Sequence, residues 1–264
     1  MSSVWQRAIP LMLVTVFSCY LLVVPLPEDG PVKLVGNASQ VAGSLVGAVY
    51  LFIAAHGFGS AEPSRRGWML LALSMASNAL GFATYGAMEL AGADNPVPSA
   101  ADLFWLLSYP LALSGIGVLA RSYLTSGLPI PRPNRAWGAT AVSLILVAVY
   151  VVLPLSQDQS SSLLERVVVA AYPVGDALVI GAAFYMAELM SSFGRGALAW
   201  PWLAIISGEM LVGMTDIAYA QLNMLDLYHT GHFVDQGWVL SGVLMALGGL
   251  LQWRIMSHEV RSGG

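Results

Sequence analysis

Charged residues are so widely spaced in this sequence that most of it falls into stretches long enough to cross a bilayer. A helix rises about 1.5 Å per residue, so about 20 apolar residues span a hydrocarbon core of about 30 Å. Charged residues make up 10% of the chain, whereas a soluble domain carries roughly 25%. A chain with so little charge cannot keep a folded surface wet. We therefore predict an all-α membrane protein, and the net charge of −4 also argues against a nucleic-acid binder.

Eight stretches have the length and composition of a transmembrane helix. Six of them lie between two charged residues, and the other two are interrupted by lone acids. The first stretch is longer than the apolar segment of a signal peptide and has no small-residue cleavage site after it, so we interpret it as a span. In chain order the predicted spans occupy roughly residues 8–27, 34–61, 67–88, 103–120, 136–157, 164–190, 197–221 and 236–253.

The basic residues predict how these spans are oriented. Nine of the eleven Lys and Arg residues fall on the side that holds both termini, and only Lys33 and Arg166 fall on the other. Cytoplasmic loops of membrane proteins collect Lys and Arg. Both termini are therefore predicted to be cytoplasmic. The loops on the opposite side are short, so outward-facing chemistry is expected in the helices or at their outer ends.

The two halves of the sequence resemble each other. The fourth and eighth spans match at an offset of 133, which aligns Asp102 with Asp235 and Trp105 with Trp238. Offsets of 133 and 134 also align the second span with the sixth and the third with the seventh, and the first and fifth spans both end in V-x-P-L. This pattern predicts two tandem four-helix repeats, residues 1–132 and 133–264, with the same orientation. A pseudo-two-fold axis along the membrane normal would relate them, and a cleft on that axis is the expected place for a site.

Acids inside the sixth and seventh spans are the strongest candidates for a functional site, because a charged residue in a span costs about 3 kcal/mol. Asp176 and Glu209 are expected at similar depths, and Asp216 lies on the helix face of Glu209, about 10 Å nearer the outer surface. Tyr172 lies one turn before Asp176, and Tyr219 lies three residues after Asp216. These five residues form the candidate ligand-binding group.

The predicted repeat does not require these acids, because the aligned residues of the first half are Gly43, Met75 and Phe82. The acids therefore add something that only the second half carries. Two interpretations stay open. They form a ligand, ion or proton site, or each is protonated and bonds a neighbouring helix as a structural clasp.

Asp102 and Asp235 each open a span at the outer surface, with Trp105 and Trp238 one turn further in. The sequence around Asp102 matches a capping box that begins at Ser99, and an acid in the first turn also complements the helix dipole. For both acids we favour a structural role over a role in a site. A shared site at the outer mouth, formed by the two Asp and the two Trp residues, is the alternative.

The remaining residues exclude several kinds of chemistry. No histidine is expected at the depth of Asp176, as a Ser/His/Asp hydrolase would require, and His229 with His232 lacks a third metal ligand. Lys33 lies in an outer loop, which excludes a retinal-type Schiff base. The sequence has no phosphate-binding or dinucleotide fingerprint. We therefore predict neither an enzyme nor a metal site, and the sequence leaves any cofactor unknown.

Three short motifs carry a family resemblance: P-S-A-A-D at 98–102 followed by Y-P at 109–110, A-Y-P-V-G-D at 171–176, and D-x-x-W at 235–238. With these motifs the chain resembles the multi-pass membrane input regions that precede GGDEF, EAL or histidine kinase domains in bacteria. The resemblance implies a sensory module of the bacterial cytoplasmic membrane that signals through the last span. No such output domain follows that span here, so it implies either an excised input region or a free-standing relative that acts through a partner.

The leading hypothesis is thus a sensory or signalling membrane domain, or a small accessory membrane subunit, that works through a partner protein. A small proton-coupled transporter is the alternative, supported by the repeat and the acids within the spans. A membrane-embedded lipid enzyme ranks third because histidines are missing. The expected partners are the lipid bilayer and a protein, no nucleic acid is expected, and a homodimer stays open.

Overall fold

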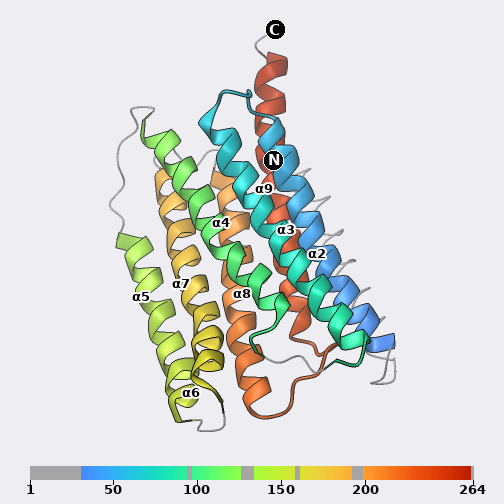
Figure 1. The fold of residues 1–264 in the computed structure, drawn as a ribbon. Helices are drawn as coiled ribbons and strands as arrows, with labels where there is room; N and C mark the ends of the chain where they lie inside the picture. Colours follow the sequence, from blue (N-terminus) through green and yellow to red (C-terminus); the bar gives the residue numbers. More distant parts are fainter. Residues whose placement is uncertain (1–30, 94–96, 126–133, 158–160, 192–198, 263–264) are drawn as a thin grey trace.

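The computed structural model describes residues 31–93, 97–125, 134–157, 161–191 and 199–262, and the predicted first span lies outside these residues. Long helices fill the described part of the chain, and in Figure 1 successive long helices run up and down the bundle alternately. The helices are α2 (Pro31–His56), α3 (Pro63–Leu90), α4 (Ala100–Leu124), α5 (Asn134–Val147), the π-helical turn η1 (Ala148–Val152), α6 (Leu153–Gln157), α7 (Leu163–Ser191), α8 (Ala199–Met224) and α9 (Asp235–Ser262).

Six helical segments among the described residues are long and apolar enough to cross a membrane. They are α2, the continuous α5–η1–α6 segment, α4, α7, α8 and the part of α9 up to Ser257. Helix α3 is as long as these six segments but is less apolar, because Ser, Asn and Gly residues interrupt its hydrophobic positions. The membrane character of the chain and its all-helical class, as predicted, are therefore present in the described residues.

The helix bounds follow the predicted spans within a few residues, apart from two differences. Helix α9 continues to Ser262, beyond the predicted end of its span at residue 253. The second span was predicted to extend to residue 61, but α2 ends at His56 and a turn begins at Gly57. Glycine commonly ends a helix, and Pro63 then starts α3 at its first turn, where proline is tolerated. Spacing between charges shows where a span fits, whereas local backbone preferences decide where its helix stops.

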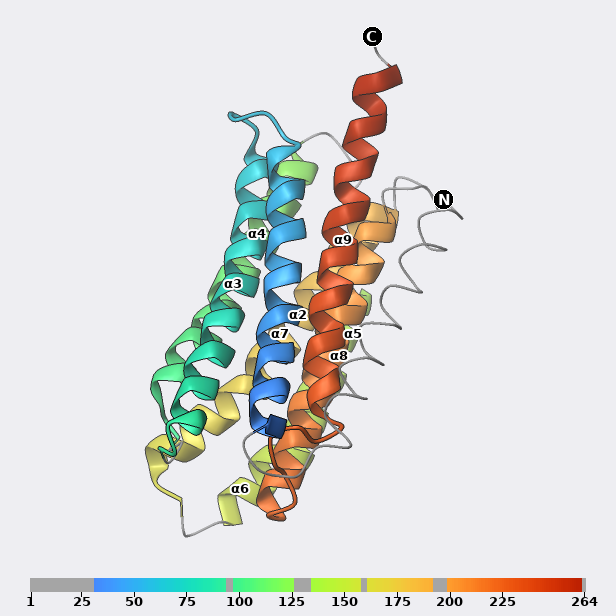
Figure 2. The ribbon, with the colours of Figure 1, turned by 90° about the vertical axis from the view of Figure 1, so that its right-hand side faces the viewer.

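Six of the helices pack in a ring. Around it, α2 contacts α3, α3 contacts α4, α4 contacts α7, α7 contacts α8, α8 contacts α9, and α9 contacts α2 again. Helix α5 packs on α7 outside the ring. The C-terminal turns of α9 project beyond the bundle at the end that holds the α2–α3 turn (Figure 2). Two crossings, α4 with α7 and α2 with α9, therefore join the earlier helices to the later ones.

The core of the ring is closed by large apolar side chains. Trp68 of α3 and Trp202 of α8 are fully buried, and their ring centroids lie 5.5 Å apart. Leu51, Leu119 and Met186 are also fully buried in the same cluster. Burying a side chain of this size stabilises the fold by about 2 kcal/mol in water. In a bilayer the close packing itself makes the larger contribution.

Candidate functional site

Asp176 lies on α7 where this helix crosses α4. Its side chain is buried, and the hydroxyl of Tyr109 on α4 donates to its Oδ1 at 2.8 Å. Two glycines make room for this contact. A Cβ on Gly175 would press on the Tyr109 ring at 2.7 Å, and a Cβ on Gly213 of α8 would lie 3.4 Å from the Cβ of Asp176. The local sequence thus lets both neighbouring helices approach one buried acid.

Asp216 on α8 completes a pair with Asp176. The indole Nε1 of Trp238 on α9 donates to Oδ1 of Asp216 at 2.7 Å. Asp216 and Asp176 also interact electrostatically, so the charge of either acid affects the other.

Glu209 belongs to the same group, but Asp176 interacts with it less than with Asp216. It is half-buried on α8 and interacts electrostatically with Asp216 and Asp176. Side chains on a helix lean toward its N-terminus. Because α7 and α8 run in opposite directions, Asp176 leans toward the chain's predicted outer side while Asp216 leans inward, so these two converge. Glu209 leans inward as well, away from Asp176.

Asp102 at the start of α4 joins the same crossing from the predicted outer side. It is buried and accepts a hydrogen bond from the hydroxyl of Tyr172 on α7. The predicted capping box is confirmed, because the Ser99 backbone N–H donates to Asp102 and the Ser99 hydroxyl accepts from Ala101. Asp102 therefore caps its own helix and at the same time ties α4 to α7.

Asp235 at the start of α9 is held differently from Asp102. It is fully buried, and its donors come from the preceding loop: the hydroxyl of Tyr228 at 3.0 Å and the backbone N–H of Gly231 at 2.7 Å. Burial, and next the charge of Asp235, raise the pKa of Tyr228 well above its ordinary value, so this hydroxyl stays a donor. Asp235 fixes the loop before α9 and does not tie it to another helix.

Aromatic rings link the four aspartates into one layer. Phe82 of α3 lies between Trp105 and Trp238, with ring centroids 5.4 and 5.8 Å away. Trp105 also contacts Tyr172, and Trp238 contacts Tyr219 at 5.6 Å. The residues predicted as a ligand-binding group and those predicted as an outer mouth are therefore parts of one continuous cluster, which we call the acid–aromatic layer: Phe82, Tyr85, Asp102, Trp105, Tyr109, Tyr172, Asp176, Asp216, Tyr219, Tyr228, Asp235 and Trp238.

Sequence reasoning did not single out Tyr109, Tyr228 or Phe82 as site residues. Tyr109 lies seven residues after Asp102, so both occupy one face of α4, and this spacing could have indicated it. Tyr228 lies seven residues before Asp235 across an irregular loop, where no periodicity applies. Phe82 is an apolar residue among many, and only its neighbours in space distinguish it.

A second polar group, also absent from the predictions, lies around Glu89 at the end of α3. Its carboxylate accepts from Asn37 Nδ2 of α2 and from Thr230 Oγ1 of the α8–α9 loop, both at 2.7 Å. Lys33 Nζ lies 3.7 Å from the same carboxylate. A Cβ on Gly36 would lie 3.1 Å from the backbone N of Gly231, so the loop rests directly on α2. Glu89 thus connects α2, α3 and the loop that enters α9.

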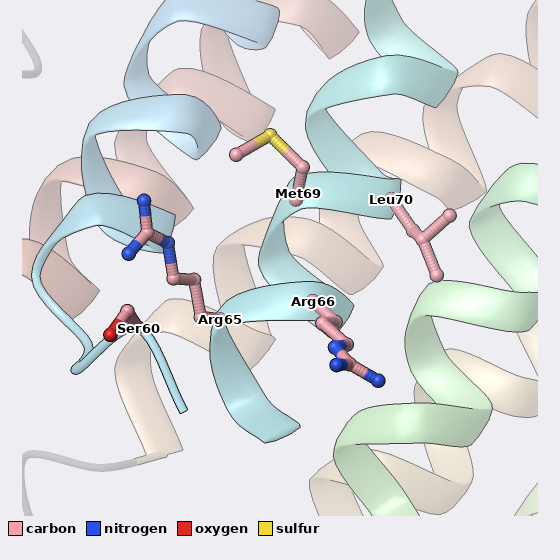
Figure 3. Close-up of a pocket in the computed structure, with 5 residues that line it drawn as sticks. All are labelled: Ser60, Arg65, Arg66, Met69 and Leu70. Carbon is pink, nitrogen blue, oxygen red and sulfur yellow. The ribbon is translucent and has the colours of Figure 1, made fainter. Parts of the chain in front are cut away.

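A shallow hollow of about 400 Å³ lies at the start of α3, away from these groups. It is lined by Ser60, Arg65, Arg66, Met69 and Leu70. In Figure 3 the two arginine side chains extend in different directions, so their guanidinium groups do not converge on one point. The hollow brings none of the predicted site residues together.

The arrangement limits the chemistry that the site supports. Within the described residues there is no group of three or more His, Cys, Asp and Glu side chains that could hold a metal ion. His229 and His232 face each other with ring centroids 5.6 Å apart. Comparison with protein-family models, with curated proteins and with solved structures found no match. What the acid–aromatic layer offers is a pair of interacting acids, the buried Asp176 and the half-buried Asp216, among aromatic rings.

Proposed function

We propose that this chain is a multi-pass sensory domain of the bacterial cytoplasmic membrane that acts through a partner protein and takes its cue at Asp176 and Asp216. One observation carries the proposal: Asp176, buried where α7 meets α4, interacts with the half-buried Asp216 of α8. Buried acids in spans mark functional positions by default. A change in their charge acts directly on the contact between two helices, which is what a signalling domain needs.

The proposal includes eight spans arranged as two related halves, with both termini in the cytoplasm and the first span in residues 8–27. The helix contacts support it. At the predicted offsets α2, α3 and α4 correspond to α7, α8 and α9, so the crossing of α4 with α7 corresponds to that of α9 with α2. Single residues agree with this. Ser108 and Ser241, 133 positions apart, each donate a hydroxyl to the carbonyl of the Trp three residues earlier.

The contrast with the first half supports a functional role for the acids. Phe82 corresponds to Asp216 and packs edge-on against Trp105, whereas Asp216 accepts from the indole of Trp238. The same helix contact is thus made once with an apolar ring and once with a half-buried acid. Because packing alone is satisfied by the apolar version, the acid in the second half is explained by a function.

The direct test of this function asks whether a partner responds to the acid pair. Native mass spectrometry of the full chain, extracted gently from its own membrane, is expected to show a co-purifying protein. We expect a change of pH to alter that protein's association or activity with the wild-type chain and to leave it unaltered with Asp176→Asn. Asp226→Asn, an exposed acid on the α8–α9 loop, is the matched control and should behave as wild type. A chain that is extracted alone, or an unchanged pH response in Asp176→Asn, would contradict the proposal.

Glu209 favours a second candidate function, a small proton-coupled transporter. It is half-buried within the span and lies close enough to Asp216 and Asp176 to interact electrostatically, so it could pass a proton along α8. Purified chain in liposomes with an imposed pH gradient would then carry a flux that Glu209→Gln removes. An equal flux in Glu209→Gln would exclude this candidate.

A further inference from the structure

Two of the four aspartates in the acid–aromatic layer have little to balance a negative charge. Asp102 and Asp235 lie in the first turn of a helix, where the helix dipole favours an acid, and each accepts from a backbone N–H. Asp176 and Asp216 lie far from the ends of α7 and α8, and each accepts one neutral side-chain donor from an adjacent helix. No Lys or Arg of the described residues forms an ion pair with either acid. A carboxylate withdrawn from water requires more compensation than this.

One oxygen of Asp176 lacks a donor altogether. The side chain is 3% exposed, and its Oδ1 accepts from the hydroxyl of Tyr109. Its Oδ2 is buried and accepts no hydrogen bond from the described residues. A buried acceptor without a donor is costly, and such atoms are rare in folded proteins. A bound molecule with a charged N–H would supply both the missing donor and the missing positive charge.

Asp216 and Trp105 border space inside the bundle. Met214 of α8 is 65% exposed and Leu103 of α4 is 69% exposed, so these two residues mark the outer faces of their helices. Asp216 and Trp105 each follow two residues later, which turns them about 200° around the helix, toward the interior. Both are nevertheless only half-buried. Side chains that face the interior and stay partly exposed border space that the described side chains do not fill.

Aromatic rings connect the two acids beside this space. Five rings from α3, α4, α7 and α9 form the connection, each with its centroid 5.4–6.5 Å from the next: Tyr109, Tyr172, Trp105, Phe82 and Trp238. The first of them donates to Asp176 and the last donates to Asp216. Ring faces attract organic cations, whereas hard metal ions prefer a shell of oxygen ligands. Rings that lie between two acids therefore favour an organic cation over a metal ion.

We propose that the acid–aromatic layer binds a small primary ammonium ion that carries an apolar or aromatic group, with an N–H of the ligand donated to Oδ2 of Asp176. Asp216 adds a second negative charge, and the rings of Trp105 and Trp238 contact the apolar part of the ligand. The N–H excludes a quaternary ammonium ion as the preferred ligand, because that ion has no hydrogen to donate. This inference rests on the proposed function, since it names the chemical class of the cue.

The first test compares three probes of one shape on the full chain in lipid nanodiscs: phenethylammonium, its trimethylated quaternary analogue and the neutral phenethyl alcohol. Isothermal titration calorimetry measures binding, and empty nanodiscs measure partition into lipid. We expect saturable binding of phenethylammonium, at least about tenfold weaker binding of the quaternary ion, and no binding of the alcohol. Equal binding of the three probes, or no saturable binding of phenethylammonium, would overturn the proposal.

The second test locates the site with variants that keep the shape of the side chain. Asp176→Asn and Asp216→Asn each remove one negative charge, and we expect each to weaken phenethylammonium binding at least about tenfold. Asp226→Asn, on the exposed loop, is the control and should keep wild-type affinity. Circular dichroism shows whether each variant retains its helices. Wild-type affinity in both variants of the pair would overturn the site, and the probe series on the wild-type chain decides the ligand class even where a variant does not fold.

The third test asks whether the rings contribute. Trp105→Leu removes a ring that borders the interior space, so we expect weaker binding of phenethylammonium. Trp253→Leu removes a ring of α9 that is 40% exposed, and it should keep wild-type affinity. Equal affinity in both variants would show that aromatic contact at Trp105 plays no part in binding.

The outcomes separate this inference from the function on which it rests. Binding of phenethylammonium that depends on Asp176, with no responsive partner protein, would leave the inference standing and contradict the sensory function. A partner that responds to the acid pair, with no ammonium binding by the chain, would overturn the inference and leave the function intact.

Discussion

The crossing of α4 with α7 and the crossing of α2 with α9 occupy corresponding places in the ring of helices, yet they are made by different kinds of contact. Glycines bring the backbones of α2 and α9 together, and Gly43 and Gly242 mark the closest approach. The other crossing has Asp176 and Tyr109 at these positions, and a hydrogen bond replaces the backbone contact. The difference teaches that corresponding helix crossings can be closed by backbone packing in one place and by a side-chain hydrogen bond in the other.

A bulky residue at the α2–α9 crossing should have the largest effect on stability. Gly242→Leu places a side chain where even a Cβ would collide with the Gly43 backbone, so we expect a loss of about 3 kcal/mol of stability or failure to fold. Thermal unfolding in detergent measures this. Gly117→Leu on α4, where an added Cβ meets no atom within 4 Å, is the control and should unfold near the wild-type temperature. Equal behaviour of the two variants would show that the α2–α9 joint is not tightly packed.

The α4–α7 crossing should be weaker than the α2–α9 crossing and sensitive to the loss of single atoms. Tyr109→Phe removes only a hydroxyl but leaves the buried Asp176 without its donor, so we expect a loss of about 2 kcal/mol. The control is Tyr50→Phe on the partly exposed side of α2, which should change stability little. Chemical unfolding of both variants provides the comparison. If Tyr109→Phe leaves the free energy of unfolding unchanged, the hydrogen bond from this hydroxyl contributes nothing to the α4–α7 crossing.

Trp105 and Trp238 occupy corresponding positions, so substitutions at these two residues compare the two halves of the chain directly. Trp238→Phe removes a donor to Asp216, whereas Trp105→Phe removes a buried indole N–H that has no acceptor among the described residues. Both changes leave a similar gap in the packing, so their difference isolates the hydrogen bond. We expect Trp238→Phe to be less stable than Trp105→Phe by about 1 kcal/mol. The opposite order would remove the argument that Asp216 needs this donor.

The smallest effect is expected at the loop that rests on the first turns of α2. Burial, and next the charge of His229, lower the pKa of His232. The folded loop therefore favours neutral His232, and this stabilisation is full above the ordinary histidine pKa of about 6.5 and is lost as the pH falls through the lowered value. Hydrogen exchange of residues 225–234 should quicken modestly at acidic pH beyond its intrinsic dependence. His232→Asn should remove this extra acceleration, and its persistence there would assign it to another group.

Much of the architecture could be read from the sequence because the bilayer requires it. Only a helix satisfies its own backbone in lipid, so the spacing of charges located α4 and the α5–η1–α6 segment within a few residues of their observed bounds. The capping box at Ser99 was also predictable, because it depends on residues three positions apart. The end of α2 was not, since charge spacing ignores the glycine turn at Gly57.

The sequence by itself determined which residues are exceptional: Asp176, Glu209 and Asp216 stand out in any span because acids are rare in lipid. It did not determine which of them meet. The sequence placed Asp176 and Glu209 at similar depths, whereas Asp176 interacts more strongly with Asp216, because side chains on antiparallel helices lean toward each other there. Tyr109, Trp238 and Phe82 complete the cluster from three other helices. The type of residue at each position is given by the sequence. A hydrogen bond across helices depends also on their relative direction and rotation, and only packing in three dimensions sets these.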